Sequence, residues 1–82
     1  MNPKVIKINV KTADELLKML YASAELGADC ELNVKGFWPN PHFSLKELQN
    51  DPDSTTMTVY ERDGSDYTIS IQSVEAIVEF NS

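Results

Sequence analysis

The residues with the most reactive side chains are few and stand apart from one another in the sequence. His42 is the only histidine, Cys30 is the only cysteine, and Ser44 follows His42 by two positions. An imidazole or a hydroxyl could accept a phosphoryl group, and a thiolate could act as a nucleophile. His42 has no serine or cysteine nucleophile directly beside it and lacks the partners that a triad or a metal site requires. The sequence therefore predicts no catalytic, cofactor or metal site, and we expect the protein not to be an enzyme.

Two further candidates for chemistry have simpler explanations. Cys30 alternates in phase with Leu32 and Val34, so it should face the core as a small hydrophobic residue with a raised thiol pKa. The acidic segment 51–54 offers oxygen ligands, but it lacks the central glycine and the distal glutamate of a calcium loop. We predict a solvated turn there.

Aromatic residues gather in one short segment that also contains two prolines. We select four residues of this segment as candidate partner-binding residues: Phe37, Trp38, His42 and Phe43. Large, rigid side chains of this kind are enriched at binding hot spots. Because Pro39 and Pro41 cannot donate to a sheet ladder, the segment should be irregular or an edge strand. The alternative is that these aromatic side chains only cover the core.

The first half of the chain predicts a strand, a helix and a second strand. Apolar residues alternate over 5–10 and over 29–35, which is typical of half-buried strands. Between them, Thr12 and Glu15 have the spacing of a capping box, and an apolar stripe follows up to Leu26. We therefore expect a helix over 13–26, closed by Gly27 as its left-handed cap, with the two strands side by side.

The second half predicts a short helix, a hairpin and an ambiguous tail. Ser44 opens a second capping box, and that helix should end near residue 50. The runs 55–61 and 66–72 flank Asp63-Gly64, a strong hairpin signal. The tail 73–80 suits a helix or a strand, and we favour the helix. The expected fold is a single α+β domain over 1–82: a small open-faced sandwich with about four mainly antiparallel strands and two to three helices on one face.

Composition narrows the classes of function. The chain of 82 residues carries a net charge of -6, and its basic residues are scattered, so we expect no nucleic-acid binding. No apolar run approaches the ~18 residues of a membrane helix, so we expect no membrane association. The N-terminal residues do not have the pattern of a secretory signal, and a single cysteine suits a reducing compartment. We expect a cytoplasmic protein that has a protein partner.

The order of the predicted elements resembles the phosphocarrier protein of the bacterial sugar phosphotransferase system, HPr. The closest local match is 22–36, which resembles the end of that family's first helix and its second strand. Residues 44–48 would correspond to the start of its short second helix, and 56–64 to its last strand. The sequence has a strand-like 67–72 where the family would begin its last helix.

The site that defines that family is not retained. Its phosphorylated histidine caps the first helix next to an arginine, whereas Thr12 and Asp14 stand at these positions here. Ser44 is the candidate for the family's regulatory serine, with a shift of one residue in the preceding loop. We expect a non-enzymatic binding or regulatory module resembling HPr in shape. The alternatives are a divergent phosphocarrier that uses His42 or Ser44, and a small phage or mobile-element protein that acts by forming homo-oligomers.

Overall fold

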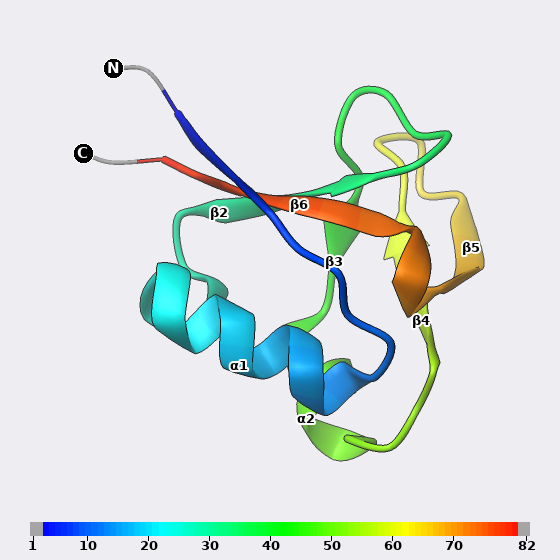
Figure 1. The fold of residues 1–82 in the computed structure, drawn as a ribbon. Coiled ribbons are helices and arrows are strands. Elements are labelled where there is room, and N and C mark those ends of the chain that lie inside the picture. Colours follow the sequence, from blue (N-terminus) through cyan, green and yellow to red (C-terminus); the bar gives the residue numbers. More distant parts are fainter. Residues whose placement is uncertain (1–2, 81–82) are drawn as a thin grey trace.

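A computed structural model describes residues 3–80, which form two small antiparallel sheets and two α-helices (Figure 1). Sheet A has the strand order β1-β6-β2, and sheet B has the order β3-β4-β5. The elements in chain order are β1 (Lys4–Lys7), α1 (Ala13–Ser23), the 3-10 turn η1 (Glu25–Gly27), β2 (Cys30–Val34), β3 (His42–Phe43), α2 (Leu45–Asn50), β4 (Thr56–Tyr60), β5 (Asp66–Ser70), the 3-10 turn η2 (Ile71–Ser73) and β6 (Val74–Glu79).

The C-terminal strand β6 is the centre of sheet A. It pairs antiparallel with β1 on one side and with β2 on the other, so that Ile77 lies opposite both Ile6 and Leu32. The prediction of a helix over 73–80 is therefore wrong, and so is the direct pairing of the first two strands. As the central strand, β6 is hydrogen-bonded along both edges; Ile77 belongs to the core, and Ala76 and Val78 are also buried.

The predicted hairpin around Asp63-Gly64 is confirmed. Met57 of β4 lies opposite Ile69 of β5, and Val59 lies opposite Tyr67. The short β3 pairs with the other side of β4, which makes 42–43 the edge strand that the two prolines favoured. The chain then leaves β5 at Ser70 and turns through η2 into β6. Because this turn redirects the chain, the strands form two three-stranded sheets and not one sheet of about four strands, although the α+β class holds.

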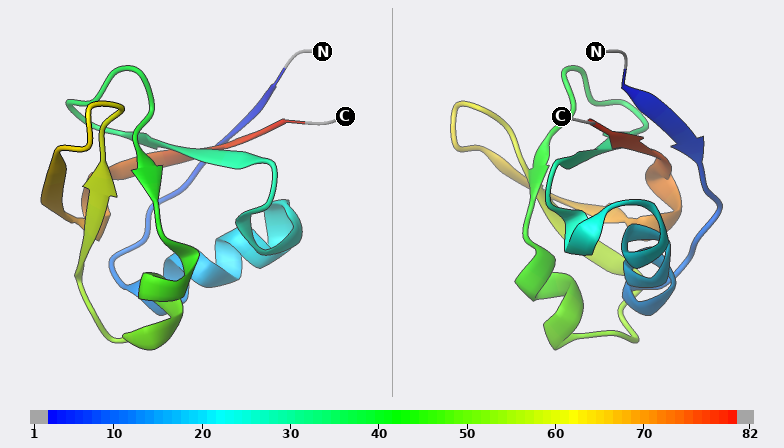
Figure 2. Two further views of the ribbon diagram at one scale, coloured as in Figure 1. Left: turned by 180° about the vertical axis from the view of Figure 1, so that it is seen from behind. Right: turned by 90° about the vertical axis from the view of Figure 1, so that its left-hand side faces the viewer.

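Both α-helices lie on the same side of sheet A (Figure 2). The core fills the space between them and the two sheets, and its fully buried side chains include Leu16, Leu20, Leu32, Leu48, Val59, Ile71 and Ile77. Helix α1 ends at Ser23, three residues before the predicted end. Its C-cap Ala24 is extended, and Leu26 (φ +51°) and Gly27 (φ +77°) then form a left-handed turn. Gly27 has the expected positive φ, but in η1 and not as the cap of α1.

Thr12 and Ser44 both cap helices, as the sequence predicts. At α1 the box is complete: the Thr12 hydroxyl accepts from Glu15 N at 3.2 Å, and the Glu15 carboxylate accepts from Thr12 N at 3.2 Å. At α2 only half of the box forms, because Ser44 Oγ accepts from Glu47 N while the Glu47 carboxylate accepts from Thr58 N at 2.7 Å. Glu47 thus ties α2 to β4 beyond the point where β3 ends.

Removal of either capping hydroxyl should destabilise the fold. Thr12→Ala and Ser44→Ala are each expected to lower the free energy of unfolding by ~0.5–2 kcal/mol, because a helix N–H loses its acceptor. Thr12→Ser keeps an acceptor and serves as the matched control. Urea unfolding followed by circular dichroism measures the effect, and midpoints that both alanine variants leave unchanged would contradict it.

Candidate functional site

Trp38 projects from the loop that joins β2 to β3. Its side chain is 85 % exposed, the largest exposed fraction among the large hydrophobic residues described. The preceding residue behaves differently: Phe37 is partly buried against the core, and its ring meets Tyr67 edge to face with centroids 5.4 Å apart. The aromatic segment is therefore divided between packing and exposure, and Trp38 is its exposed member.

The loop around Trp38 is fixed on both sides. Before it, Phe37 N donates to Val34 O at 3.0 Å, and Gly36 (φ +86°) takes the left-handed position of this turn. After it, the Asn40 amide donates to the Glu31 carboxylate at 2.9 Å and accepts from Asn33 at 3.3 Å. These contacts hold the loop against β2, so the indole projects from a backbone with two anchors.

A hollow of about 250 Å³ adjoins this loop, on the side of the β4–β5 turn. It is lined by Pro39, Asn40, Pro41, Glu61, Arg62 and Asp63. The turn is itself fixed, because Ser65 N donates to the Asp63 carboxylate at 2.9 Å, which lowers the pKa of Asp63. The Tyr67 hydroxyl donates to Glu61 at 3.0 Å, and this hydrogen bond raises the pKa of Tyr67. The surface beside Trp38 thus combines prolines with charges of both signs.

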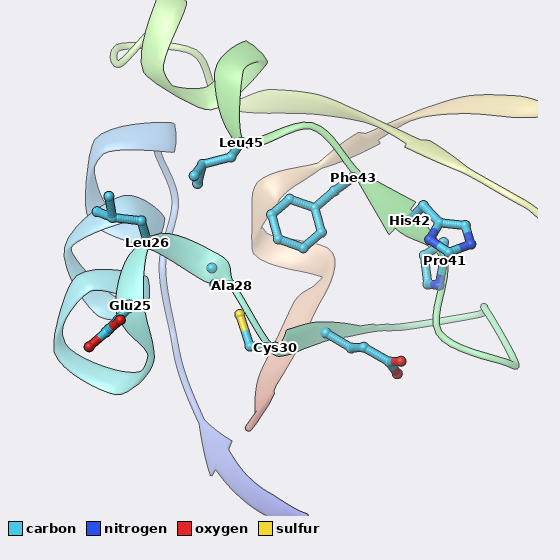
Figure 3. A pocket seen from close by; sticks show the side chains of 10 residues that line it. Glu25, Leu26, Ala28, Cys30, Pro41, His42, Phe43 and Leu45 are labelled. Carbon is cyan, nitrogen blue, oxygen red and sulfur yellow. The ribbon is translucent and has the colours of Figure 1, made fainter. Parts of the chain in front are cut away.

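The other two candidate residues belong to a second surface. His42 is exposed on β3, and Phe43 points into an open groove of about 570 Å³ between β3 and the η1 turn (Figure 3). The groove is lined by Glu25, Leu26, Gly27, Ala28, Cys30, Glu31, Pro41, His42, Phe43 and Leu45. Glu25 and Leu26 were not predicted to lie in a groove, because the apolar spacing placed them within the first helix. The glycine after them was the only signal that the helix could end early.

Cys30 lies half-buried in this groove and is poorly suited to act as a nucleophile. Burial is the largest influence that raises the pKa of its thiol, and the carboxylates of Glu79, Asp29 and Glu31 raise it further. The expectation that Cys30 packs as a small hydrophobic residue agrees with its contact with the core.

The raised pKa of Cys30 makes its reactivity testable. At pH 8 we expect the folded protein to react with iodoacetamide at least about tenfold more slowly than the urea-unfolded chain, because less of the thiol is ionised and less is accessible. The rate should increase with pH through a midpoint above the ordinary value for a cysteine. Mass spectrometry of the alkylated protein measures the reaction rate of Cys30 at each pH. Equal rates in the folded and unfolded states would contradict the prediction.

Neither helix start is arranged to hold a phosphoryl group. Ser44 Oγ accepts from Glu47 N, and at α1 the Glu15 carboxylate already accepts from Lys11 N at 2.7 Å and from Thr12 N. A phosphate at α1 would have to displace this carboxylate and would meet Asp14 beside it.

Three observations concern broader classes of function. Within residues 3–80, no group of three or more His, Cys, Asp or Glu side chains is placed to hold a metal ion. None of the helices in the same range is long and apolar enough to cross a membrane. Comparisons with protein-family models, with curated proteins and with solved structures found no match. The geometry of the two surfaces is therefore the basis for a functional proposal.

Proposed function

We propose that this protein is a non-enzymatic binding or regulatory module that docks a protein partner through the loop around Trp38. The observation that supports the proposal most strongly is the 85 % exposure of this single tryptophan. Tryptophan is among the residues most enriched at binding hot spots. Covering an indole that is exposed to water removes a large apolar surface from water, which favours binding.

The anchors of the loop support the same function. A flexible loop would lose conformational entropy on binding, which weakens the complex. Here Phe37 is packed on Tyr67 and Asn40 is held by Glu31 and Asn33, so the Trp38 backbone is ordered before the partner arrives. The adjoining hollow between Pro39 and Arg62 would accept a small side chain of the partner.

The proposal includes a cytoplasmic location, which the single cysteine favours. Only the order of elements from β1 to β4 supports a likeness in shape to HPr, because the chain continues into two strands, β5 and β6, after that point. A carrier that uses His42 or Ser44 is less favoured, since the Ser44 hydroxyl already caps α2 and two carboxylates line the groove beside His42.

Site-specific crosslinking tests the docking surface. A photoreactive amino acid is placed at position 38, and the matched control carries it at position 21, where Tyr21 is also exposed (49 %) but lies on α1. After irradiation in the host cell, position 38 should yield a discrete crosslinked protein that position 21 does not yield. A crosslink common to both positions, or crosslinking at neither, would reject the Trp38 loop as the docking surface.

A further inference from the structure

The groove between η1 and β3 has an apolar interior built from two distant parts of the chain. Phe43 comes from β3 and Leu45 from the first position of α2, and Leu26 comes from η1 (Figure 3). Gly27, the last residue of η1, also lines the groove. The backbone of Gly27 approaches this interior closely: a Cβ built on it would lie 3.6 Å from Leu45 Cδ1 and 3.7 Å from Phe43 Cζ. These are ordinary van der Waals distances, so Gly27 lies directly beside the apolar side chains of the groove.

Leu26 is the unusual residue of the groove. It has a left-handed backbone (φ +51°), which costs a leucine ~1–2 kcal/mol relative to a right-handed conformation, and its side chain is 55 % exposed. Asparagine or glycine would adopt this backbone more easily. Neither the local conformation nor burial in the core accounts for a leucine here, and such outliers cluster at functional sites.

With the histidine counted as neutral, both charged residues that line the groove are acidic. Glu25 and Glu31 line it, and its ten lining residues include no lysine or arginine. Asp29 and Glu79 lie near enough to Cys30 to influence its thiol. The whole chain carries a net charge of -6. It should therefore attract a cationic partner and repel a second copy of itself.

We infer that this groove binds a segment of a partner protein in which apolar side chains are flanked by lysine or arginine. The apolar side chains would pack between Leu26, Phe43 and Leu45, and the cationic ones would pair with Glu25 and Glu31. The groove is a surface distinct from the exposed indole of Trp38, and its use does not depend on the docking function proposed for that loop.

A short synthetic peptide serves as the probe, with a Leu-Phe centre flanked on each side by lysines. Its binding is followed by amide chemical shifts of the full-length protein. Shifts should be confined to 25–31 and 41–45, and raising the salt concentration should weaken binding. Two control peptides, with glutamate in place of lysine or serine in place of Leu-Phe, should each bind at least about tenfold more weakly.

Two variants of the protein separate the apolar and ionic contributions. Leu26→Asn removes the apolar wall while suiting the left-handed backbone, so the fold should be preserved and the affinity for the lysine peptide should fall at least about tenfold. Glu25→Lys should weaken binding of the lysine peptide and strengthen binding of the glutamate peptide. Glu25 is preferred to Glu31 for this purpose, because Glu31 also accepts a hydrogen bond from Asn40. Val5→Ala, an exposed substitution on β1 outside the groove lining, is the matched control and should leave the affinity unchanged.

Three results would overturn the inference. One is the absence of chemical-shift changes with the lysine peptide up to about 1 mM, because a specific site of this kind should bind it with a dissociation constant below that concentration. Another is binding that Leu26→Asn leaves intact but Trp38→Ala abolishes, which would assign the peptide to the other surface. The third is a set of groove shifts that depends on protein concentration alone, which would assign the groove to a second copy of this chain.

Discussion

Replacement of Ile77 by alanine is expected to remove ~2–5 kcal/mol of folding free energy. Ile77 is fully buried in the central strand β6, opposite Ile6 of β1 and Leu32 of β2, and it contacts the core under α1. A domain of this length has a total stability of only ~4–12 kcal/mol, so a substantial fraction of it should be lost. The deleted side-chain atoms lie in the core, and the β6 backbone is held by β1 on one edge and β2 on the other, which limits how far the site can collapse.

Val5→Ala is the matched control within the same sheet. Val5 is 59 % exposed on the edge strand β1, and its removal should change the stability by no more than ~0.5 kcal/mol. Both variants can be compared by urea unfolding followed by far-ultraviolet circular dichroism, since the exposed Trp38 is a poor reporter of the core. Equal losses for Ile77→Ala and Val5→Ala would contradict the burial of Ile77 in the core.

The sequence predicted those features that depend on short segments. The capping hydroxyls of Thr12 and Ser44 precede their helices by one residue, and the Asp63-Gly64 turn joins adjacent strands. Each is determined by residues within a few positions of one another, where hydrogen bonds and backbone preferences act without the rest of the fold.

The errors concern contacts between distant segments. The tail 73–80 has apolar residues at both helical and alternating spacing, so its pattern suits a helix or a strand. It forms a strand because it pairs with β1 on one side and with β2 on the other. Helix α1 also ends earlier than its apolar spacing predicts: Ala24 is extended, and Leu26 then takes a left-handed backbone that leucine disfavours on its own. Gly27 lies beside Phe43 and Leu45, which follow it by 16 and 18 positions in the sequence, and no local pattern could have indicated these contacts.

The position of the aromatic segment could be predicted from the sequence, but the separate surroundings of its side chains could not. The two prolines indicated correctly that the aromatic segment lies outside a regular central strand, and Trp38 in it is exposed. The division of the segment was not foreseen: Phe37 packs on Tyr67 of the hairpin, while Phe43 faces the groove beside η1. Both contacts join elements far apart in the chain, so the aromatic spacing alone could not separate them.

Trp38→Ala should weaken the complex with the crosslinked partner by about 2 kcal/mol or more, which corresponds to a loss of about 30-fold in affinity. The same substitution should change the free energy of unfolding by no more than ~0.5 kcal/mol, because an indole that is 85 % exposed contributes little to the core. A buried tryptophan would instead cost ~3–5 kcal/mol. The ratio of the two effects distinguishes a docking residue from one that covers the core.

The fluorescence of this single tryptophan allows the test to begin on the protein alone. An indole in water should emit at long wavelength and be quenched readily by acrylamide, and the emission should shift to shorter wavelength when the partner binds. Trp38→Phe is the matched control for size, since it keeps an aromatic ring and should lose less affinity than Trp38→Ala. Emission that acrylamide cannot quench in the free protein would place the ring in the interior. Trp38→Ala should then destabilise the fold as a core substitution does, and the loop would have to be regarded as a cover for the core.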